Sequence, residues 1–429
     1  MTRGGRIERS SMRRPQADIE PLDDPEPLDD PEPLDDPLTS DRFRRLPWWV
    51  AVLIVFGLSR IVTTAMMLVL AAQQDQNAWT AAAPRYVDFA SMWDGRWYNI
   101  VAVAGYPAEL PLTDDGHTAE NAWAFLPVYP LVVRTVMILT GAEWAVAAVA
   151  VSVLAGFGAA LVTYRLFREH LDAGTALFGV VIFSVAPVAP VFQVAYAESL
   201  HLLLLSLALL LLVRRRYGLL MPVVVVMGFT RPSALAFALL LGLHLLVRIV
   251  RRDREPFASG ELPLVIGATL LSGLVGLAWP AVAWAVTGSV TAYTDTELAW
   301  RSVYIGYQHL IPFTPWFQGF EWWFGRPLGW IGVILLVAGF AVALTSRPVR
   351  MLGLEVRLWL AAYALYLLAV FFPQSSTFRL LVPFFPFAGA IAVPRSRVYR
   401  TTVVMGSIAL QWLWLLVAWR VDGYDWTPP

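Results

Sequence analysis

The chain has 429 residues, of which 58% are hydrophobic and only 15% are charged. A soluble protein of this length would carry about a quarter charged residues, so the composition excludes an ordinary soluble protein and is typical of a polytopic membrane protein. Cysteine is absent, which excludes disulfides and thiolate chemistry. The formal net charge is zero, and no nucleic-acid partner is expected.

The first 45 residues form a distinct segment, which contains the repeat PLDDPEPLDDPEPLDDP between groups of arginines. A segment this rich in proline and acid cannot bury enough apolar surface to fold. Residues 1–45 are therefore predicted to be a disordered cytoplasmic tail, with a docking motif for a cytoplasmic partner as the alternative. No apolar core follows the first arginines, so we expect no cleavable signal peptide.

The rest of the chain is dominated by apolar runs near the length of about 20 residues that a membrane-spanning helix needs. Residues 46–421 are predicted to form one all-α membrane domain with about eleven transmembrane helices, followed by a short tail at 422–429. The first span is Trp48–Ala72. The later spans are expected near 143–166, 173–191, 195–213, 217–231, 233–250, 262–287, 327–345, 356–373, 378–393 and 401–420.

Arginine clusters give the expected orientation, because cytoplasmic loops carry an excess of basic residues. The clusters precede the first span and recur at Arg165–Arg168, Arg214–Arg216, Arg248–Arg254, Arg347–Arg357 and Arg395–Arg400. One arrangement of spans makes the N-terminus and every cluster cytoplasmic, with outer loops at 73–142 and 288–326. Residues 123–140 then do not cross and form an interfacial or re-entrant helix. If they do cross, a short span within 217–250 is re-entrant instead.

A distinctive motif, SMWDGRWYNIVAVAGYP, occupies Ser91–Pro107 after the first span. Tryptophan and tyrosine concentrate at membrane interfaces, so the motif is predicted to be an interfacial helix on the outer face. It contains Asp94. A carboxylate in a partly dry interfacial site can have its pKa raised toward the working pH, as a general base requires. The alternatives are a local ion pair with Arg96 and an ordinary surface charge.

Other ionisable residues are expected at the same outer side. Glu198 is the first residue of a predicted span. It is either a second acid at an acceptor site or an acid that the macrodipole favours at a helix N-terminus. His201 lies one turn later on the same helix face, and it is either a site residue or a residue that only packs in the helix bundle. Arg231 and Arg379 stand at outer ends of spans, where a guanidinium either grips a phosphate or extends to headgroups.

The outer loop at 291–324 combines many aromatic side chains with acids and His309. Aromatic faces suit sugar rings and equally suit an interfacial belt. His309 could pair with Asp295 or Glu297, but the sequence does not fix their distance. No Walker loop, dinucleotide fingerprint or metal-ligand spacing occurs, so a lipid-linked donor is favoured over a soluble nucleotide sugar.

Five motifs follow one another in the order of a known family. They are WDGRWYNIVAVAGYP (93–107), AFLPVYPLVVR (124–134), APVFQVAYAESLHLLL (189–204), FTRPSAL (229–235) and FRLLVPFFPF (378–387). Together, across residues 48–393, they resemble the mannosyltransferase family that includes the second GPI mannosyltransferase and its bacterial relatives. Two positions depart from the family pattern: Ala197 stands where threonine is common, and His201 where an aromatic residue is common.

The resemblance implies a GT-C fold and transfer of mannose from polyprenyl-phosphate mannose to a glycolipid or envelope glycan. The transfer would be a single inverting displacement at the outer face of the plasma membrane. Asp94 would be the general base, and Arg231 or Arg379 would hold the leaving phosphate. Residues expected to contact the acceptor or the sugar are Trp93, Arg96, Tyr129, Tyr196, Glu198, His201 and His309.

The remaining expectations concern cofactor, source and alternatives. No cofactor is expected, and no divalent metal. The arginine-rich, lysine-free composition is typical of a high-GC bacterium such as an actinobacterium. The alternatives are a related enzyme that uses another lipid-linked sugar (arabinose, galactofuranose or an aminosugar) and a non-enzymatic lipid-linked-sugar transporter. The sequence does not name the acceptor.

Overall fold

The computed structural model describes residues 46–421, so the predictions for 1–45 and 422–429 lie outside the described residues. The described part is all-helical, with 71% helix and no strand. A single β-bridge joins Leu112 and Thr118 in the loop after α4 (Asp94–Ala104). The expected all-α class is therefore confirmed.

Five helices in the described part are long and apolar enough to cross a membrane. They are α2 (Trp48–Ala72), α6 (Trp144–Arg168), α11 (Glu261–Thr287), α15 (Leu328–Thr345) and α20 (Arg397–Trp414), which continues as the π-helical turn η5 (Leu415–Trp419). Shorter helices beside them are α7 (Ala173–Val185), α8 (Glu198–Val213), α9 (Tyr217–Gly228), α10 (Ala234–Val250) and α17 (Leu354–Val370). The count of about eleven spans stays a prediction.

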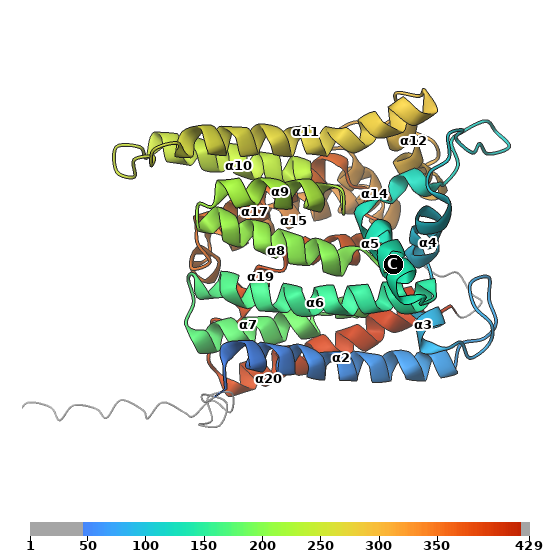
Figure 1. Ribbon diagram of the computed structural model, residues 1–429, viewed down its shortest axis with the longest axis horizontal. Helices are drawn as coiled ribbons and strands as arrows, with labels where there is room; N and C mark the ends of the chain where they lie inside the picture. Colours follow the sequence, from blue (N-terminus) through green and yellow to red (C-terminus); the bar gives the residue numbers. More distant parts are fainter. Residues whose placement is uncertain (1–45, 422–429) are drawn as a thin grey trace, which may run out of the picture.

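These helices lie side by side as a bundle (Figure 1). α6 packs on α8, α7 and α2, while α10 packs on α11 and α17. Small residues permit close approach: a Cβ added to Gly228 would collide with Val275, and one added to Gly276 would collide with Leu235. Close packing at small residues is typical of helices that associate in a membrane, where no hydrophobic effect drives them together.

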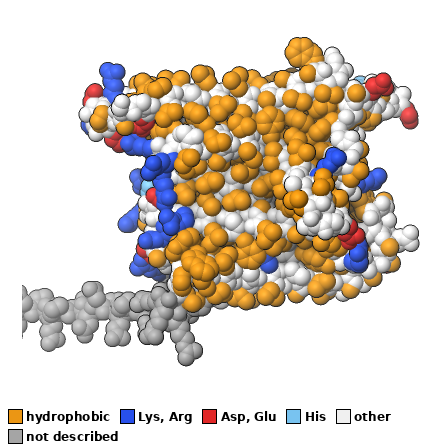
Figure 2. Space-filling view, viewed as in Figure 1, with side chains coloured by type: hydrophobic (Ala, Val, Ile, Leu, Met, Phe, Trp, Pro, Cys, Tyr) orange, Lys and Arg blue, Asp and Glu red, His pale blue; other side chains and the backbone are white. Residues whose placement is uncertain are grey.

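The two ends of the bundle differ in charge. Figure 2 shows hydrophobic side chains across the middle and basic side chains gathered at the end that carries the turns α6–α7, α8–α9 and α10–α11. We call this the basic end. The other end, the aspartate end, carries α3 (Tyr86–Phe89), α4, α5 (Val128–Thr140) and α12 (Ala292–Ala299). That the basic end is cytoplasmic stays a prediction.

The segment 123–140 begins within η2 (Ala122–Ala124) and ends with the 13-residue α5. This helix packs on α4 and α6 at the aspartate end. Thirteen residues extend about 20 Å, against about 30 Å for a hydrocarbon core. Whether this segment crosses stays a prediction, because α7, which lies in an expected span, also has 13 residues. The loop at 288–326, which is predicted to be outer, contains α12, α13 (Ser302–Ile305) and α14 (Pro315–Phe324).

Two predicted spans are not continuous helices. The one near 378–393 divides into α18 (Thr377–Leu380), η4 (Val382–Phe384) and α19 (Phe387–Ile391). The one near 173–191 ends with α7 at Val185 and continues as η3 (Ala189–Gln193). Both breaks contain prolines, which lack the amide donor that a helix interior needs.

Candidate active site

Asp94 is the first residue of α4 and lies at the aspartate end. Trp93 before it has a φ of 59°, in the left-handed region that is rare for a bulky residue. The Trp93 indole is buried and donates to the backbone carbonyl of Trp419 at 3.2 Å. Packing therefore holds a strained backbone directly before the acid, which is a pattern found at functional sites.

Four charged side chains from distant parts of the chain meet here. Arg379 of α18 forms an ion pair with Asp94. Its Nη1 also lies 3.4 Å from Glu198 Oε1, and Arg231 Nη1 lies 3.4 Å from the same oxygen. The exposed fractions are 17% for Asp94 and 8% for Arg379. We call Asp94, Glu198, Arg231 and Arg379 the charge cluster; it holds two acids and two arginines largely out of water.

Two buried tyrosines line the charge cluster. The Tyr98 hydroxyl lies 3.4 Å from Arg231 Nη1. The Tyr196 hydroxyl accepts a hydrogen bond from the Asp94 amide at 3.3 Å, and its ring centroid is 5.0 Å from the Arg379 guanidinium. A guanidinium is attracted to the face of an aromatic ring at this distance. The tyrosines therefore position both arginines and the first turn of α4.

The hydrogen bonding of the charge cluster is incomplete. Both carboxylate oxygens of Glu198 and the Nε of Arg379 are buried without a hydrogen-bond partner. Leaving a buried charged group unsatisfied is costly, so such groups in a folded protein require an explanation. A bound molecule that offers hydroxyl donors and phosphate acceptors would satisfy both kinds of group.

The structure separates the predicted site residues into three groups: those in or lining the charge cluster, those that are exposed, and those buried beside the site. Tyr196 and Glu198 join the charge cluster, as do both predicted phosphate-binding arginines. Arg96 and His309 are exposed, and neither contributes to the cluster contacts among the described residues. The proposed Asp94–Arg96 pair does not form, because residues two apart on a helix do not face each other.

Tyr129, His201 and Trp93 are buried beside the site. The Tyr129 hydroxyl donates to the Ala148 carbonyl at 3.0 Å and also contacts Ser152. Its ring packs on Tyr98 at 5.1 Å between centroids. His201 lies one turn after Glu198 on α8, with Nδ1 buried and without a hydrogen-bond partner. Tyr129 therefore supports the scaffold, whereas His201 keeps an unused polar atom next to the cluster.

The sequence analysis did not select Tyr98, and it named Glu297 only as one possible partner of His309. Tyr98 follows Asp94 by four residues, and this helical spacing places both on one face of α4. Glu297 lies on α12 near Tyr293 and Arg301, and burial raises its pKa above the ordinary carboxyl value. The hydroxyl of Tyr293 and the charge of Arg301 oppose this rise. No spacing signal distinguishes Glu297 from the other acids of its loop.

The fold and the site define a class: an α-helical protein with membrane-spanning helices and a buried charge cluster at one end. Comparison with protein-family models and with curated proteins finds no match to this chain. The mannosyltransferase resemblance therefore stays an expectation. Within residues 46–421, no three histidine, aspartate or glutamate side chains are grouped so as to hold a metal ion; the prediction that no metal is needed stays a prediction.

Proposed function

We propose that the chain is a GT-C-class glycosyltransferase of the plasma membrane that transfers mannose from polyprenyl-phosphate mannose to a glycolipid or envelope glycan at the outer face. The charge cluster is the observation that supports this proposal most. It brings a carboxylate for proton transfer together with two arginines that suit a phosphate. It lies at one end of an apolar bundle, where a lipid-linked substrate would have access from the bilayer.

Donor binding is the first step of the proposed reaction. The phosphodiester of the donor enters beside Arg379 and Arg231 and accepts hydrogen bonds from their guanidinium groups. The Arg379 Nε, which has no partner in the structure, gains one in this way. The phosphate takes over the guanidinium that pairs with Asp94, because a charged phosphate offers several strong acceptor oxygens. Asp94 is then free to face the acceptor hydroxyl.

Transfer follows as one displacement. The acceptor oxygen attacks the anomeric carbon of mannose as the bond from that carbon to the phosphate oxygen breaks, so the configuration inverts. The acceptor proton passes to the Asp94 carboxylate. The electron pair of the broken bond leaves with polyprenyl phosphate, whose additional negative charge is offset by Arg231 and Arg379.

Glu198 has a positioning role in this scheme. Its carboxylate lies 3.4 Å from each arginine and reduces their mutual repulsion before the donor arrives. Its buried oxygens, which lack hydrogen-bond donors, also suit the hydroxyl groups of a sugar. A carrier would instead place its polar site near the middle of the membrane between symmetric repeats. The position of the cluster at one end favours an enzyme.

The proposal is tested with membranes that lack the chromosomal copy and contain the wild-type chain or Asp94→Asn. Radiolabelled mannose is supplied as polyprenyl-phosphate mannose, and labelled membrane lipids are separated and counted. Asp94→Asn is expected to lower transfer by about a hundredfold or more, because it removes the general base. The matched control is Asp88→Asn on α3, a nearby acid in an exposed ion pair with Arg85 at 2.7 Å, which should keep full activity.

Transfer by Asp94→Asn at the wild-type rate would refute the assignment of the base. If neither chain transfers mannose, the same membranes are supplied with polyprenyl-phosphate arabinose, galactofuranose and aminosugar donors. Transfer from one of these donors would support the glycosyltransferase proposal but show that its donor sugar is not mannose. Failure with every donor would reject the glycosyltransferase proposal in favour of the transporter alternative.

A further inference from the structure

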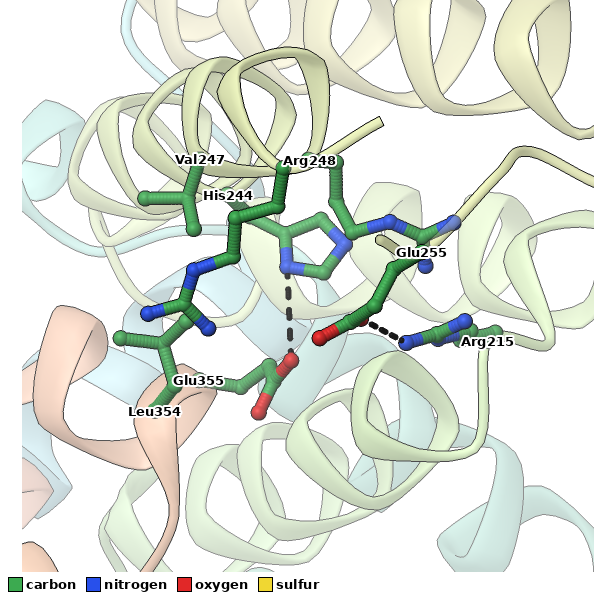
Figure 3. A pocket seen from close by; sticks show the side chains of 8 residues that line it. Arg215, His244, Val247, Arg248, Glu255, Leu354 and Glu355 are labelled. Carbon is green, nitrogen blue, oxygen red and sulfur yellow. Dashed lines mark hydrogen bonds and ion pairs between the residues drawn. The ribbon is translucent and has the colours of Figure 1, made fainter. Parts of the chain in front are cut away.

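A cavity of about 210 Å³ lies at the basic end, remote from the charge cluster, and Figure 3 shows the side chains that line it. It opens between the α8–α9 turn, the last turns of α10, the loop after α10 and the start of α17. Its polar lining residues are Arg215, His244, Arg248, Arg251, Glu255 and Glu355. A second cavity of about 460 Å³ shares Arg215 with it and reaches Glu261.

The inner wall of this basic cavity is formed by buried polar groups. His244 is 1% exposed and Arg248 is 3% exposed. Arg248 pairs with Glu261, with 3.1 Å between Nη1 and Oε1 and a hydrogen bond of 3.2 Å from Nη2 to Oε2, while its buried Nε has no hydrogen-bond partner. His244 contacts the Tyr217 hydroxyl through Nε2 at 2.9 Å. One buried donor, the Arg248 Nε, therefore remains available beside the cavity.

The His244 Nδ1 is a second buried atom without a hydrogen-bond partner. It lies 3.6 Å from Glu355 Oε1, as the dashed line in Figure 3 shows, which is too long for a hydrogen bond. The His244 Nδ1 therefore stays without a hydrogen-bond partner at the place where α10 and α17 pack together. The carboxylates that face the cavity are Glu355 and Glu255.

Two of the three arginines that line the cavity are already paired with carboxylates, Arg248 with Glu261 and Arg215 with Glu255. Glu255 is occupied by Arg215 at 2.8 Å in a pair that is about half exposed, and such surface pairs contribute little stability. Arg251 is exposed and forms no ion pair among residues 46–421. Arg251 is the C-cap residue of α10, three residues after Arg248, and both arginines line the same cavity.

We propose that the basic cavity binds a phosphate group, held by Arg248 and Arg251 with Arg215 at the rim. Guanidinium forks match phosphate oxygens, and basic pockets between helices at a membrane surface are suited to anionic headgroups. Two sources share this chemistry: the headgroup of an anionic phospholipid at the edge of the apolar band, and a soluble phosphate. The proposal does not depend on the function of the charge cluster.

The test uses the full chain in nanodiscs, with melting followed by tryptophan fluorescence. One arm compares phosphatidylcholine with phosphatidylcholine that contains phosphatidic acid. The other arm titrates inorganic phosphate into the phosphatidylcholine nanodiscs. A rise in melting temperature that saturates with the probe is expected in at least one arm, because a ligand that binds only the folded state stabilises it. A rise confined to phosphatidic acid identifies a headgroup, and a rise with inorganic phosphate identifies a soluble anion.

Arg251→Gln is expected to weaken the apparent affinity about tenfold, since it removes one charge-assisted contact at an exposed position where folding is not at risk. Arg248→Lys should weaken it less, because it keeps the charge but loses the fork. Arg397→Gln, an exposed arginine at the same end but outside the cavity, is the control and should respond like wild type. An equal response of wild type and Arg251→Gln, or no response to either probe, overturns the proposal.

Discussion

The two ends of this bundle use charge in opposite ways. At the basic end most ion pairs are open to solvent, such as Arg395 with Asp172, which are 77% and 54% exposed. At the aspartate end, Glu198 and Arg379 are 5% and 8% exposed and share their partners. The basic end also contains one buried pair, Arg248 with Glu261 at 4% and 9% exposed, but the aspartate end gathers four mostly buried charges that share partners. The burial of a small group of charges therefore indicates a candidate active site better than the number of charges does.

Removal of Arg379 should produce the largest effect, because it leaves Asp94 and Glu198 without their shared counter-charge. Arg379→Met is expected to lower the free energy of unfolding by roughly 3–5 kcal/mol, the usual cost of breaking a buried pair. Thermal unfolding in detergent, followed by tryptophan fluorescence, measures this. Arg395→Met at the basic end is the matched control. Equal melting of the two variants would remove the distinction between the ends.

Glu198→Gln should have a smaller effect. The amide keeps the shape of the side chain but no longer offsets the charges of Arg231 and Arg379, each 3.4 Å from the carboxylate. Loss of charge-assisted contacts is expected to reduce stability by about 1.5–3 kcal/mol. The same melting assay measures it. A variant as stable as wild type would show that Glu198 is not needed to hold the arginines together.

Glu297→Gln should act only over part of the pH range. Burial raises the pKa of Glu297 above its ordinary value of 4.5, so below pH 4.5 the carboxyl is protonated in both the folded and the unfolded chain. As the pH rises, the unfolded chain ionises first and the stability of wild type falls until the folded chain also ionises.

The glutamine variant lacks this loss. Its melting temperature, measured against pH, should equal that of wild type at low pH and exceed that of wild type at neutral pH. Asp295→Asn, in the same helix, is the comparison variant. A Glu297→Gln variant that melts below wild type at neutral pH would show that Tyr293 and Arg301 outweigh the cost of burial.

The smallest effect is expected at the basic end. Arg214 and Glu169 form an ion pair at 2.6 Å, but the side chains are 38% and 25% exposed. Glu169→Gln should change the free energy of unfolding by less than about 1 kcal/mol, because solvent screens such pairs. Melting at low and high salt measures the difference. A loss as large as that of Glu198→Gln would contradict the contrast between the two ends.

Several features of the fold were predictable from local pattern. Apolar runs such as Trp48–Ala72 identify helices because burial of a whole span in lipid requires an apolar side chain at nearly every position. Asp94 stood out because one acid occurs among interfacial aromatic residues. The break at 378–393 was missed, although Pro383 and Pro386 are visible there, because hydropathy alone does not register a missing backbone donor.

The sequence by itself determined the membrane class, the arginine clusters and a helix that contains Asp94, since each depends on neighbouring residues. Only the tertiary structure decided that Asp94 pairs with Arg379, 285 residues away, and not with Arg96. It also placed Glu198 between two arginines and left His309 exposed. The physical reason is that ion pairs form across helix faces, and packing of distant helices decides which faces meet.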